Sequence, residues 1–509
     1  MQTTTRSTSL TQGLGSRRWL VLGIVSVALL LIVIDMTVLY TALPRLTHDL
    51  AATASAKLWI INSYSLVVSG LLLGMGTLGD RLGHKRLFIA GLAVFGGASL
   101  AAAFAPSAGV LIAARALLGV GAAMMMPATL SLIRLSFCDE KERALAIGIW
   151  SSVASGGAAF GPVLGGALLE HFWWGSVFLI NVPIVLIALP LAWRYIPASQ
   201  GNRERPWDLV ASIQVMLGLM AGTYAIKELG KQSPDWALAA FALLTGIGFL
   251  WIFVRRQRSS SHPLLDLALF QDKGFSTAVI SALVAAAALL GMELVFSQRL
   301  QLVLGFSPLE AGWAVLPLPV AAFVAGPIAG RLLPRWGSSR LLALALLASG
   351  LGMGAYLALH EATALWQSLS LVLLGLGIGG AITAASATML MRAPADRAGM
   401  AASVEEVSYE LGGALGVTVM GSLLSAVYAH SLVVPEAAAA AALPSTVRDS
   451  LDEALLASER MPLDAAQSLV QAASAAFDKG FAAVLLLATL LLLVTAWVAW
   501  RTRTRTRTR

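Results

Sequence analysis

The stretch that decides the fold is residues 19–43, WLVLGIVSVALLLIVIDMTVLYTAL, an apolar run that contains one acidic residue, Asp35. A helix needs about 20 apolar residues to cross roughly 30 Å of hydrocarbon, and this run is long enough. It is too long for the apolar core of a signal peptide, and it lacks an obvious small-residue cleavage site. We therefore expect it to remain in the protein as the first membrane span.

Similar apolar runs recur along the whole chain. Of its 509 residues 58% are hydrophobic and only 12% are charged, about half the charged share of a typical soluble domain. The sequence therefore predicts an all-α integral membrane protein with 14 transmembrane helices. The expected spans are residues 19–43, 57–77, 87–105, 108–130, 144–168, 174–194, 207–226, 235–254, 275–297, 309–330, 341–359, 364–388, 399–428 and 480–500.

The basic residues are divided unequally between the two sides of these spans. Roughly three quarters of the 35 Lys and Arg residues fall in the two terminal tails and the loops after even-numbered spans, a bias typical of the cytoplasmic side. We therefore expect a bacterial inner-membrane protein with both termini in the cytoplasm. Membrane lipid explains the net charge of +8 better than nucleic acid does. The terminal Arg-Thr repeat, residues 501–509, is expected to lie against anionic lipid.

Two loops of the chain resemble each other. The loop Gly76-Thr-Leu-Gly-Asp80-Arg81-Leu-Gly83-His84-Lys85-Arg86 is matched, at a constant offset, by Gly330-Arg-Leu-Leu-Pro334-Arg335-Trp-Gly337-Ser-Ser-Arg340. The stretches 118–121 and 374–377 repeat at a similar offset. Duplicated halves that rock about a central site are a transporter architecture. The sequence thus predicts two pseudo-repeated six-helix bundles plus an inserted central helix pair, spans 7 and 8.

This division gives five parts of the chain. They are a cytoplasmic N-terminal tail (1–18), an N-terminal six-helix bundle (19–200), the inserted pair (201–262), a C-terminal six-helix bundle (263–500) and a cytoplasmic tail (501–509). The C-terminal bundle includes one long outer loop, residues 430–478. This loop is rich in Ala and is expected to pack as short helices or as a flexible cap.

Taken together, the motifs resemble those of the major facilitator superfamily, and specifically its fourteen-span drug:proton antiporters related to quaternary-ammonium and methyl-viologen exporters. The 76–86 loop is similar to the family's cytoplasmic gating signature, with His84 where Arg or Lys is commoner. Residues 35–44, with Asp35, Thr37 and Pro44, are similar to a span-1 signature, with Tyr40 in place of the usual Asn.

Three further stretches carry the resemblance. Arg115 with the glycines that follow it is similar to the family's arginine signature. The run 178–183, with Phe178 and Asn181, is similar to a common span-6 pattern. The run 157–166 is similar to the antiporter signature, which rests on Gly157, Gly161, Pro162, Gly165 and Gly166.

The resemblance implies a proton-coupled multidrug efflux antiporter. It would export lipophilic organic cations (quaternary ammonium compounds, biguanides, dyes and viologens) by alternating access, as a monomer. No Walker loop occurs in the sequence, so ATP is not the expected energy source. We expect a secondary transporter and not an enzyme, driven by the proton motive force without a cofactor. We expect no metal site, since the six His residues are scattered and Cys138 is the single cysteine.

The acidic residues within spans are the candidate coupling groups. A charge at mid-bilayer costs at least about 2.5–3.5 kcal/mol, so it needs a partner or a purpose. Asp35 lies near the middle of span 1, and Glu406 and Glu410 share one face of span 13. Burial and mutual repulsion both disfavour two ionised carboxylates, so this pair is expected to titrate together and to hold either a proton or a cation. Structural hydrogen bonding is the alternative.

Other charged residues have more open roles. Glu405 points about 100° away from Glu406, toward the same site or toward a polar crevice without function. Arg115 is expected either to pair with one of the acids and modulate proton release, or to lock two helices together. Glu293 near the outer end of span 9 is read as an interfacial residue or a substrate contact. In the 76–86 loop, Gly76, Asp80, Arg81, Gly83, Lys85 and Arg86 are expected to form contacts that differ between conformations.

Small and aromatic residues complete the candidate site. Gly157, Gly161 and Gly165 fall on one helix stripe, which allows a neighbouring helix to approach closely, for sliding or for plain packing. An organic cation also favours aromatic faces. The candidates by position are Tyr40, Trp59, Tyr64, Trp150, Phe178, Trp313 and Tyr409, together with Asn181.

Two other function classes remain open at this level. An exporter of an endogenous antibiotic or siderophore-like metabolite fits the same fold, although three mid-membrane acids favour cations. A channel or a membrane enzyme fits less well, because no nucleophile or metal constellation is visible and a channel needs no mobile titratable acids.

Overall fold

The computed structural model describes residues 5–137, 139–198, 201, 207–229, 234–260, 263–394, 398–439 and 443–506. Within these ranges the secondary structure is entirely helical. Thirteen helices are long and apolar enough to cross a membrane. The remaining predicted span, 144–168, lies within the long helix α5 (Glu140–His171). The prediction of an all-α, multi-pass membrane fold is confirmed.

Helices α1 to α7 form the N-terminal half. Their bounds are α1 Thr5–Asp49, α2 Ala54–Leu82, α3 His84–Ala103, α4 Ala108–Ser136, α5 Glu140–His171, α6 Ser176–Leu179 and α7 Asn181–Tyr195. Within this half α1 packs against α5, and α4 packs against both α2 and α3. The core between them is mostly apolar, with buried Ser and Thr side chains, so the buried charged residues Asp35, Lys57 and Arg115 stand out.

The C-terminal half contains the spans that follow the inserted pair, together with the outer loop. Its elements are η1 Leu267–Gln271, α10 Lys273–Gln298, the π-helical turn η2 Arg299–Val303, α11 Pro308–Val315, α12 Pro317–Trp336, α13 Ser338–Leu359, α14 Ala364–Arg392, α15 Ala398–Ser431, α16 Glu436–Ala439, η4 Ser445–Arg448, α17 Leu451–Ser458 and α18 Leu463–Thr506. Between α15 and α18 the described part of the 430–478 loop contains short helices, which is one of the two forms expected for it, whereas residues 463–478 belong to the long helix α18.

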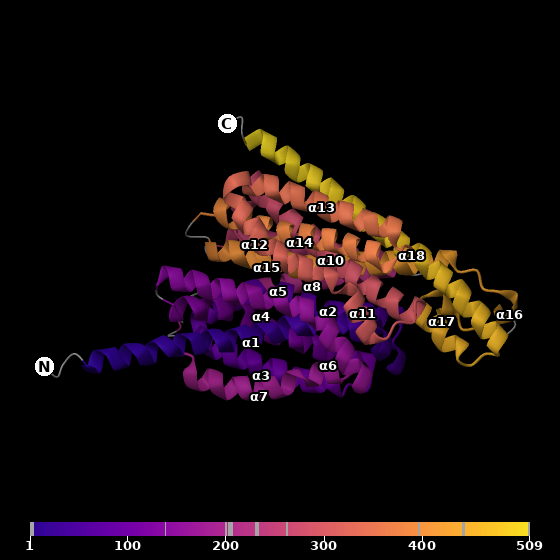
Figure 1. Ribbon diagram of the computed structural model, residues 1–509, viewed down its shortest axis with the longest axis horizontal. Helices are drawn as coiled ribbons and strands as arrows, with labels where there is room; N and C mark the ends of the chain where they lie inside the picture. Colours follow the sequence, from indigo (N-terminus) through magenta and orange to yellow (C-terminus); the bar gives the residue numbers. More distant parts are fainter. Residues whose placement is uncertain are drawn as a thin grey trace.

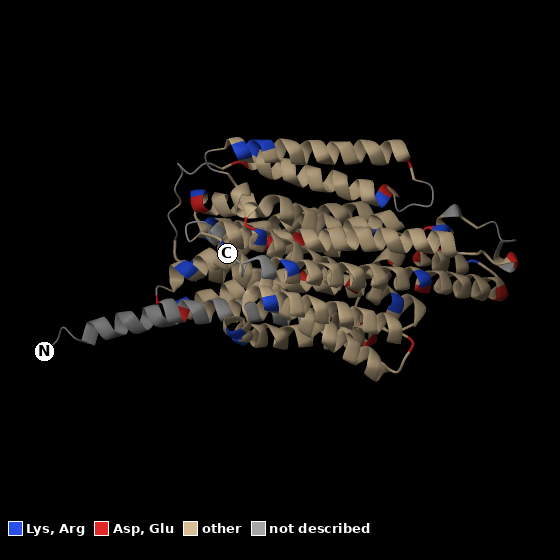
Figure 2. Ribbon diagram, turned by 90° about the horizontal axis from the view of Figure 1, so that it is seen from above, with Lys and Arg blue, Asp and Glu red and all other residues tan. Residues whose placement is uncertain are grey.

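The two halves form two stacks of roughly parallel helices (Figure 1). They meet where α2 packs against α15, α1 against α10, and α5 against α11 and α12. Both chain ends lie at one end of the molecule, here called the terminal end, whereas α16 and α17 lie at the opposite end, the α17 end (Figure 1). Many of the Lys and Arg positions gather toward the terminal end (Figure 2).

The repeated loops adopt the same geometry in both halves. Gly83 ends α2 and begins α3 with φ 94°, and Gly337 ends α12 and begins α13 with φ 75°. Backbone with positive φ is easily reached only by glycine. The matched glycines of the two sequence motifs thus serve the same turn, which agrees with a duplicated origin of the halves.

The inserted pair consists of α8 (Leu209–Leu229) and α9 (Trp236–Ser259). Helix α8 packs against α2 and α15, one from each half, while α9 packs against α8. In the most apolar segments of α8 and α9, only 28% and 22% of the residues, respectively, are buried inside the protein. The pair is central in the sequence but peripheral in space. The predicted boundaries at residues 200 and 262, and the outermost residues of both tails, lie outside the described residues.

Candidate functional site

A buried polar network lies inside the N-terminal half. Arg115 on α4 forms an ion pair with Asp35 on α1, and their side chains are 2% and 0% exposed. Asn181 on α7 donates from Nδ2 to Asp35 Oδ1 at 3.3 Å and lies 3.2 Å from Ser99 Oγ. Arg115 Nε also donates to the carbonyl of Ile60 at 3.2 Å. The network compensates both charges and thereby offsets much of the cost of burying them.

Tyr64 on α2 extends this network toward the C-terminal half. The Arg115 guanidinium lies 4.6 Å from the centre of the Tyr64 ring. The Tyr64 hydroxyl is buried and makes no hydrogen bond to a described residue, and the charged groups near it are Glu410, Asp35 and Arg115. Tyr64 therefore lies near both the basic residue of one half and an acid of the other.

Glu410 on α15 is that acid. It is 4% exposed, its Oε2 has no hydrogen-bond partner, and its polar neighbours include Ser65 of α2 and Arg115. Two turns further along α15, Thr418 accepts a hydrogen bond of 2.6 Å from Asn62 of α2. The predicted site residues Asp35, Arg115 and Glu410 thus gather where α2 meets α15.

Glu406 lies one turn from Glu410 but in different surroundings. It lines a cavity of about 420 Å³ that opens at the terminal end between the two halves. The same cavity is lined by residues of the repeated loop and of α4, namely Gly76, Thr77, Asp80, His84, Pro127, Leu130, Ser131 and Arg134, and by Met400, Ala402 and Ser403 of α15. Glu406 is therefore the acid that an ion can reach from the terminal end, and Glu410 is the enclosed one.

Glu405 points away from this cavity, as its position on the helix predicts. Its carboxylate lies near Ser386 of α14 and 3.5 Å from the Tyr409 hydroxyl. Tyr409 also lies 3.4 Å from the carbonyl of Ile382. Both predicted site residues are thus engaged inside the C-terminal half, and the structure does not bring them to the central cluster.

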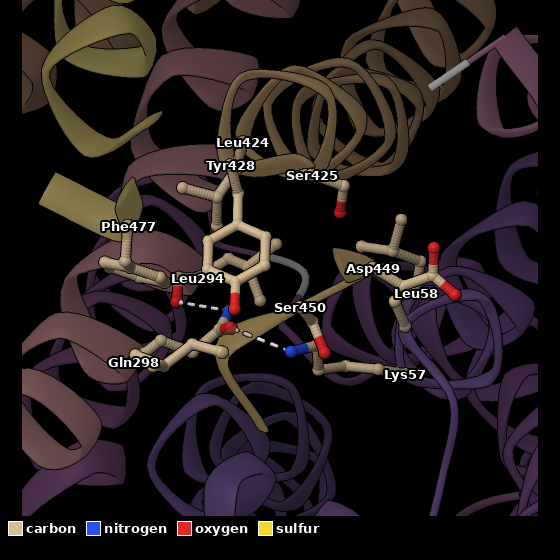
Figure 3. Close-up of a pocket in the computed structure, with 13 residues that line it drawn as sticks. Lys57, Leu58, Leu294, Gln298, Leu424, Ser425, Tyr428, Asp449, Ser450 and Phe477 are labelled. Atoms are coloured by element: carbon tan, nitrogen blue, oxygen red, sulfur yellow. Dashed lines mark hydrogen bonds between the residues drawn. The ribbon is translucent and has the colours of Figure 1, made fainter. Parts of the chain in front are cut away.

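The α17 end of the interface is closed by polar contacts between the halves. Lys57 on α2 donates to Gln298 Oε1 on α10 at 2.9 Å and forms a buried ion pair with Asp452 on α17. Figure 3 shows Lys57 and Gln298 pointing toward each other beside a cavity of only about 20 Å³. Ser297 donates to the carbonyl of Tyr40 at 2.6 Å. The small cavity beside Lys57 and Gln298 has room for little more than one water molecule.

The sequence analysis does not select these closing residues. Lys57 stands at the start of the predicted span 57–77, and the Ala-rich composition of residues 430–478 carries no chemical signal. The one available signal in the sequence is Gln298 beside Arg299 at the end of the predicted span 275–297, since buried amides need hydrogen-bond partners. Long-range pairing between residues almost 400 positions apart leaves no mark in a single sequence.

The predicted antiporter helix α5 has glycines on two faces. A Cβ on Gly161 would lie 2.8 Å from Thr37 Cβ, and one on Gly165 would lie 2.5 Å from Val38 Cγ2, so this stripe, which includes Gly157, packs on α1 of the same half. A Cβ on Gly166 instead would lie 2.5 Å from Leu309 Cα of α11. The expected close approach is present, but Gly166 rather than the stripe meets the other half. Pro162 lies beside it, because its carbonyl approaches Gly312.

The residues of the 76–86 loop have separate contacts. His84 Nε2 lies 3.1 Å from Asp80 Oδ1 one turn away. Lys85 donates to the carbonyls of Trp193 and Ile196 at 2.8 and 2.7 Å, so it holds the end of α7. Arg81 is half-buried and Arg86 is exposed. The loop contributes Gly76 and Asp80 to the cavity that Glu406 lines.

The aromatic candidates divide into two groups. Tyr40 and Tyr64 lie buried at the interface between the halves, close to Glu410. The others lie elsewhere: Trp59 packs against α8, where the Lys227 ammonium is 4.4 Å from its ring; Trp150 packs on the N-terminal core; Phe178 is fully buried there; and Trp313 is 57% exposed on the surface. Their selection as substrate contacts by position alone is not supported by this geometry.

Two roles are expected for Glu293, an interfacial residue or a substrate contact, and its side chain lies inside the protein. It is 9% exposed, and its buried Oε2 has no hydrogen-bond partner among the described residues. Among the described residues no group of three or more His, Cys, Asp or Glu side chains could hold a metal ion.

Comparison with known proteins agrees with this geometry. The family model of the Major Facilitator Superfamily matches residues 25–214 and 207–417. The chain is 41% identical to the methyl viologen resistance protein SmvA of Salmonella typhimurium, over 95% of this chain and 98% of that protein. It is 39% identical to the multidrug efflux pump LfrA of Mycolicibacterium smegmatis, over 98% and 99% of the two chains.

The fold is also shared with a solved transporter. A bacterial homologue of the human lysosomal transporter Spinster superposes with a TM-score of 0.62, at 16% identity, over 96% of this chain and 98% of that one. A duplicated helical fold, buried charges at the interface of its halves and full-length relatives among drug exporters lead to one assignment. The chain belongs to the Major Facilitator Superfamily and is a multi-pass membrane transporter of its drug-exporting group, not an enzyme.

Proposed function

We propose that the protein exports lipophilic organic cations in exchange for protons. The observation that carries the proposal is the position of Glu406 and Glu410, one turn apart on α15, with one lining the open cavity and the other enclosed beside Arg115. A carboxylate in a low-dielectric site is stable only when a proton or a cation neutralises it. Because each occupant excludes the other, the pair couples their movements.

The proposed cycle starts from the state described here. A cationic amphiphile enters the cavity at the terminal end and meets Glu406 first. It then displaces the proton held by the Glu406–Glu410 pair and lies against the Tyr64 and Tyr40 rings, which suit a flat cation. Closing of the terminal end and parting of the contacts around Lys57 expose the site to the other side, where protons replace the cation.

The ion pair of Asp35 and Arg115 has a defined part in this cycle. Arg115 is a fixed cation near Glu410, so it lowers the affinity of that site for a second positive charge and favours release. Asp35 and Asn181 hold the guanidinium in place. Of the two roles expected for Arg115, modulating the acids and locking helices, the geometry supports both at once.

The proposal includes an orientation. The excess of Lys and Arg on one side favours a bacterial inner membrane with the terminal end in the cytoplasm. The open cavity then faces the cytoplasm, and the closed α17 end faces outward. Protons and membrane lipid are the proposed partners besides the cationic substrate, with the proton motive force as energy source and the monomer as the working unit.

The test uses purified protein in liposomes with an imposed pH gradient. Wild-type protein should move ethidium against its gradient, and the movement should stop on addition of a protonophore. Glu406→Gln should lower this transport by roughly a hundredfold, because a group that moves protons contributes about that much. Asp35→Asn should also lower it, because the Arg115 guanidinium loses the carboxylate that holds it in place. Both proteins should still be inserted normally. Equal transport by both variants would refute the coupling site. Ethidium flux that ignores the protonophore would instead favour a channel, and transport of neutral metabolites alone an exporter of endogenous compounds.

A further inference from the structure

Glu293 belongs to a polar row on the face of α10 that meets α1. One turn further on, Ser297 donates to the carbonyl of Tyr40 at 2.6 Å. Gln301, in the π-helical turn η2, donates to the carbonyl of Thr41 at 3.0 Å and to Ser297 Oγ at 2.9 Å. Two members of the row therefore hold α1 directly, and Glu293 is the third member at the inner end.

Glu293 differs from its two neighbours in its contacts. It is 9% exposed, and its buried Oε2 has no hydrogen-bond partner among the described residues. A buried carboxylate without a partner is costly and is retained where it has a function. Short π-helical turns such as η2 also occur frequently at functional sites.

The charged groups around Glu293 connect it with the central cluster. The charged groups near the Tyr40 hydroxyl of α1 are Glu293, Glu410 and Arg115, so Tyr40 lies near both Glu293 and the central cluster. Two basic residues near the α17 end are paired with other acids, Lys57 with Asp452 and Arg299 with Asp478 of α18 at 2.8 Å.

These contacts put Glu293 on the path between the central acids and the α17 end. The Ser297 and Gln301 bonds to α1 separate it from solvent on that side. When α1 and α10 part, these two bonds must break, and Glu293 then becomes accessible to the outer solution.

We propose that Glu293 is the outer proton-binding carboxylate of the exchange cycle, which takes up a proton from the outer solution as the exported cation leaves. This inference rests on the proposed function and adds to it a separate entry point for protons. It assigns Glu406 to the inner solution and Glu293 to the outer one, with Glu410 between them.

The experiment measures ethidium exchange in liposomes with a fixed inner pH and a varied outer pH. Wild-type transport should rise as the outer pH falls. Glu293→Gln keeps the shape and the burial of the side chain but cannot take up a proton. It should lower the rate by roughly tenfold or more and remove its dependence on outer pH, while equilibrium binding of ethidium from the inner side stays within about twofold.

Two further variants make the outcome specific. Glu293→Asp retains a carboxylate and should restore the dependence on outer pH. Glu361→Gln removes an acid whose side chain is 86% exposed, and should behave as the wild type. If Glu293→Gln left the pH profile unchanged, the proposed role of Glu293 would be overturned but the proposed function would stand. If both Glu293 variants lost ethidium binding, Glu293 would be a structural residue, and its proposed role would again be overturned. Wild-type protein that shows no proton-driven exchange would overturn the proposed function as well.

Discussion

The two ends of the interface between the halves are built differently. At the α17 end, side chains of one half bond directly to the other, through Lys57 with Gln298 and Asp452, and through Ser297 with the carbonyl of Tyr40. At the terminal end, the halves enclose a cavity of about 420 Å³ that reaches Glu406. Paired polar groups close the α17 end, whereas the cavity opens at the terminal end. The difference shows that the acids are reached from one side only in this state.

The two ends also differ in how deeply their charged pairs are buried. The Lys57–Asp452 pair is nearly excluded from solvent, at 8% and 9% exposure, whereas the Asp80–His84 pair at the terminal end has an Asp that is 37% exposed. Buried pairs are strongly destabilised when one partner is lost, whereas exposed pairs contribute little. Opening the α17 end is therefore the step that we expect mutations to affect most.

The largest effect is expected from Lys57→Met. It leaves Asp452 buried without its cation, which costs about 3–5 kcal/mol when only one partner of a buried pair is removed. The α17 end should then open. Labelling of Ser425→Cys, which lines the small cavity there, by an impermeant maleimide from the α17 side should increase strongly. The experiment is done with Cys138→Ser to remove the native thiol.

The double variant Lys57→Met/Asp452→Leu is the matched control. Removing both charges leaves no unpaired ion, so most of the lost stability should return and labelling should fall again. If the single and the double variants label equally, the charge pair does not close this end.

An intermediate effect is expected from Gly166→Ala. The added Cβ would lie 2.5 Å from the backbone of Leu309 in the other half, so either α5 or α11 must move, at a cost of about 1–3 kcal/mol. The change should raise maleimide labelling at the α17 end. Gly157→Ala is the control, because its Cβ would lie 3.0 Å from the flexible Leu30 side chain within one half; it should leave labelling near the wild-type level. If Gly157→Ala raised labelling more than Gly166→Ala, the contact between the glycine stripe of α5 and α1 would control opening instead.

The smallest effect is expected from His84→Gln at the terminal end. The His84–Asp80 contact joins neighbouring turns and is partly exposed, so its loss should change thermal stability by less than about 1 kcal/mol. Labelling at the α17 end should stay unchanged. A loss of thermal stability as large as that caused by Lys57→Met would mean that the polar contacts at the two ends contribute equally to stability.

The sequence predicted the fold because its signals are local. Each span is an apolar run, and the matched Gly83 and Gly337 turns are visible as repeated motifs. It also selected Asp35, Arg115, Glu406 and Glu410, because a charge in a span is costly enough to be informative. The buried position of Glu293 could not be predicted, since its neighbour Tyr40 lies on a distant part of the chain.

The positions of the aromatic candidates could not be predicted for a related reason. A Trp in a span has the same local signature whether it faces lipid, a core or a cavity. Trp59 meets α8, and Trp313 lies on the surface. Which side a span turns to the interface depends on packing between helices, which one sequence does not display. The 430–478 loop was uninformative by composition, although its Asp452 closes the interface.

The peripheral position of α8 and α9 has a consequence for the route of the substrate. Helix α8 packs against both α2 of one half and α15 of the other, and α9 packs on α8, so the pair covers this side of the junction between the halves. In the proposed cycle, a compound that moves sideways from the bilayer toward this edge would meet α8 and α9 before the junction. The opposite edge, where α5 runs along α11 and α12, is then the more direct sideways route.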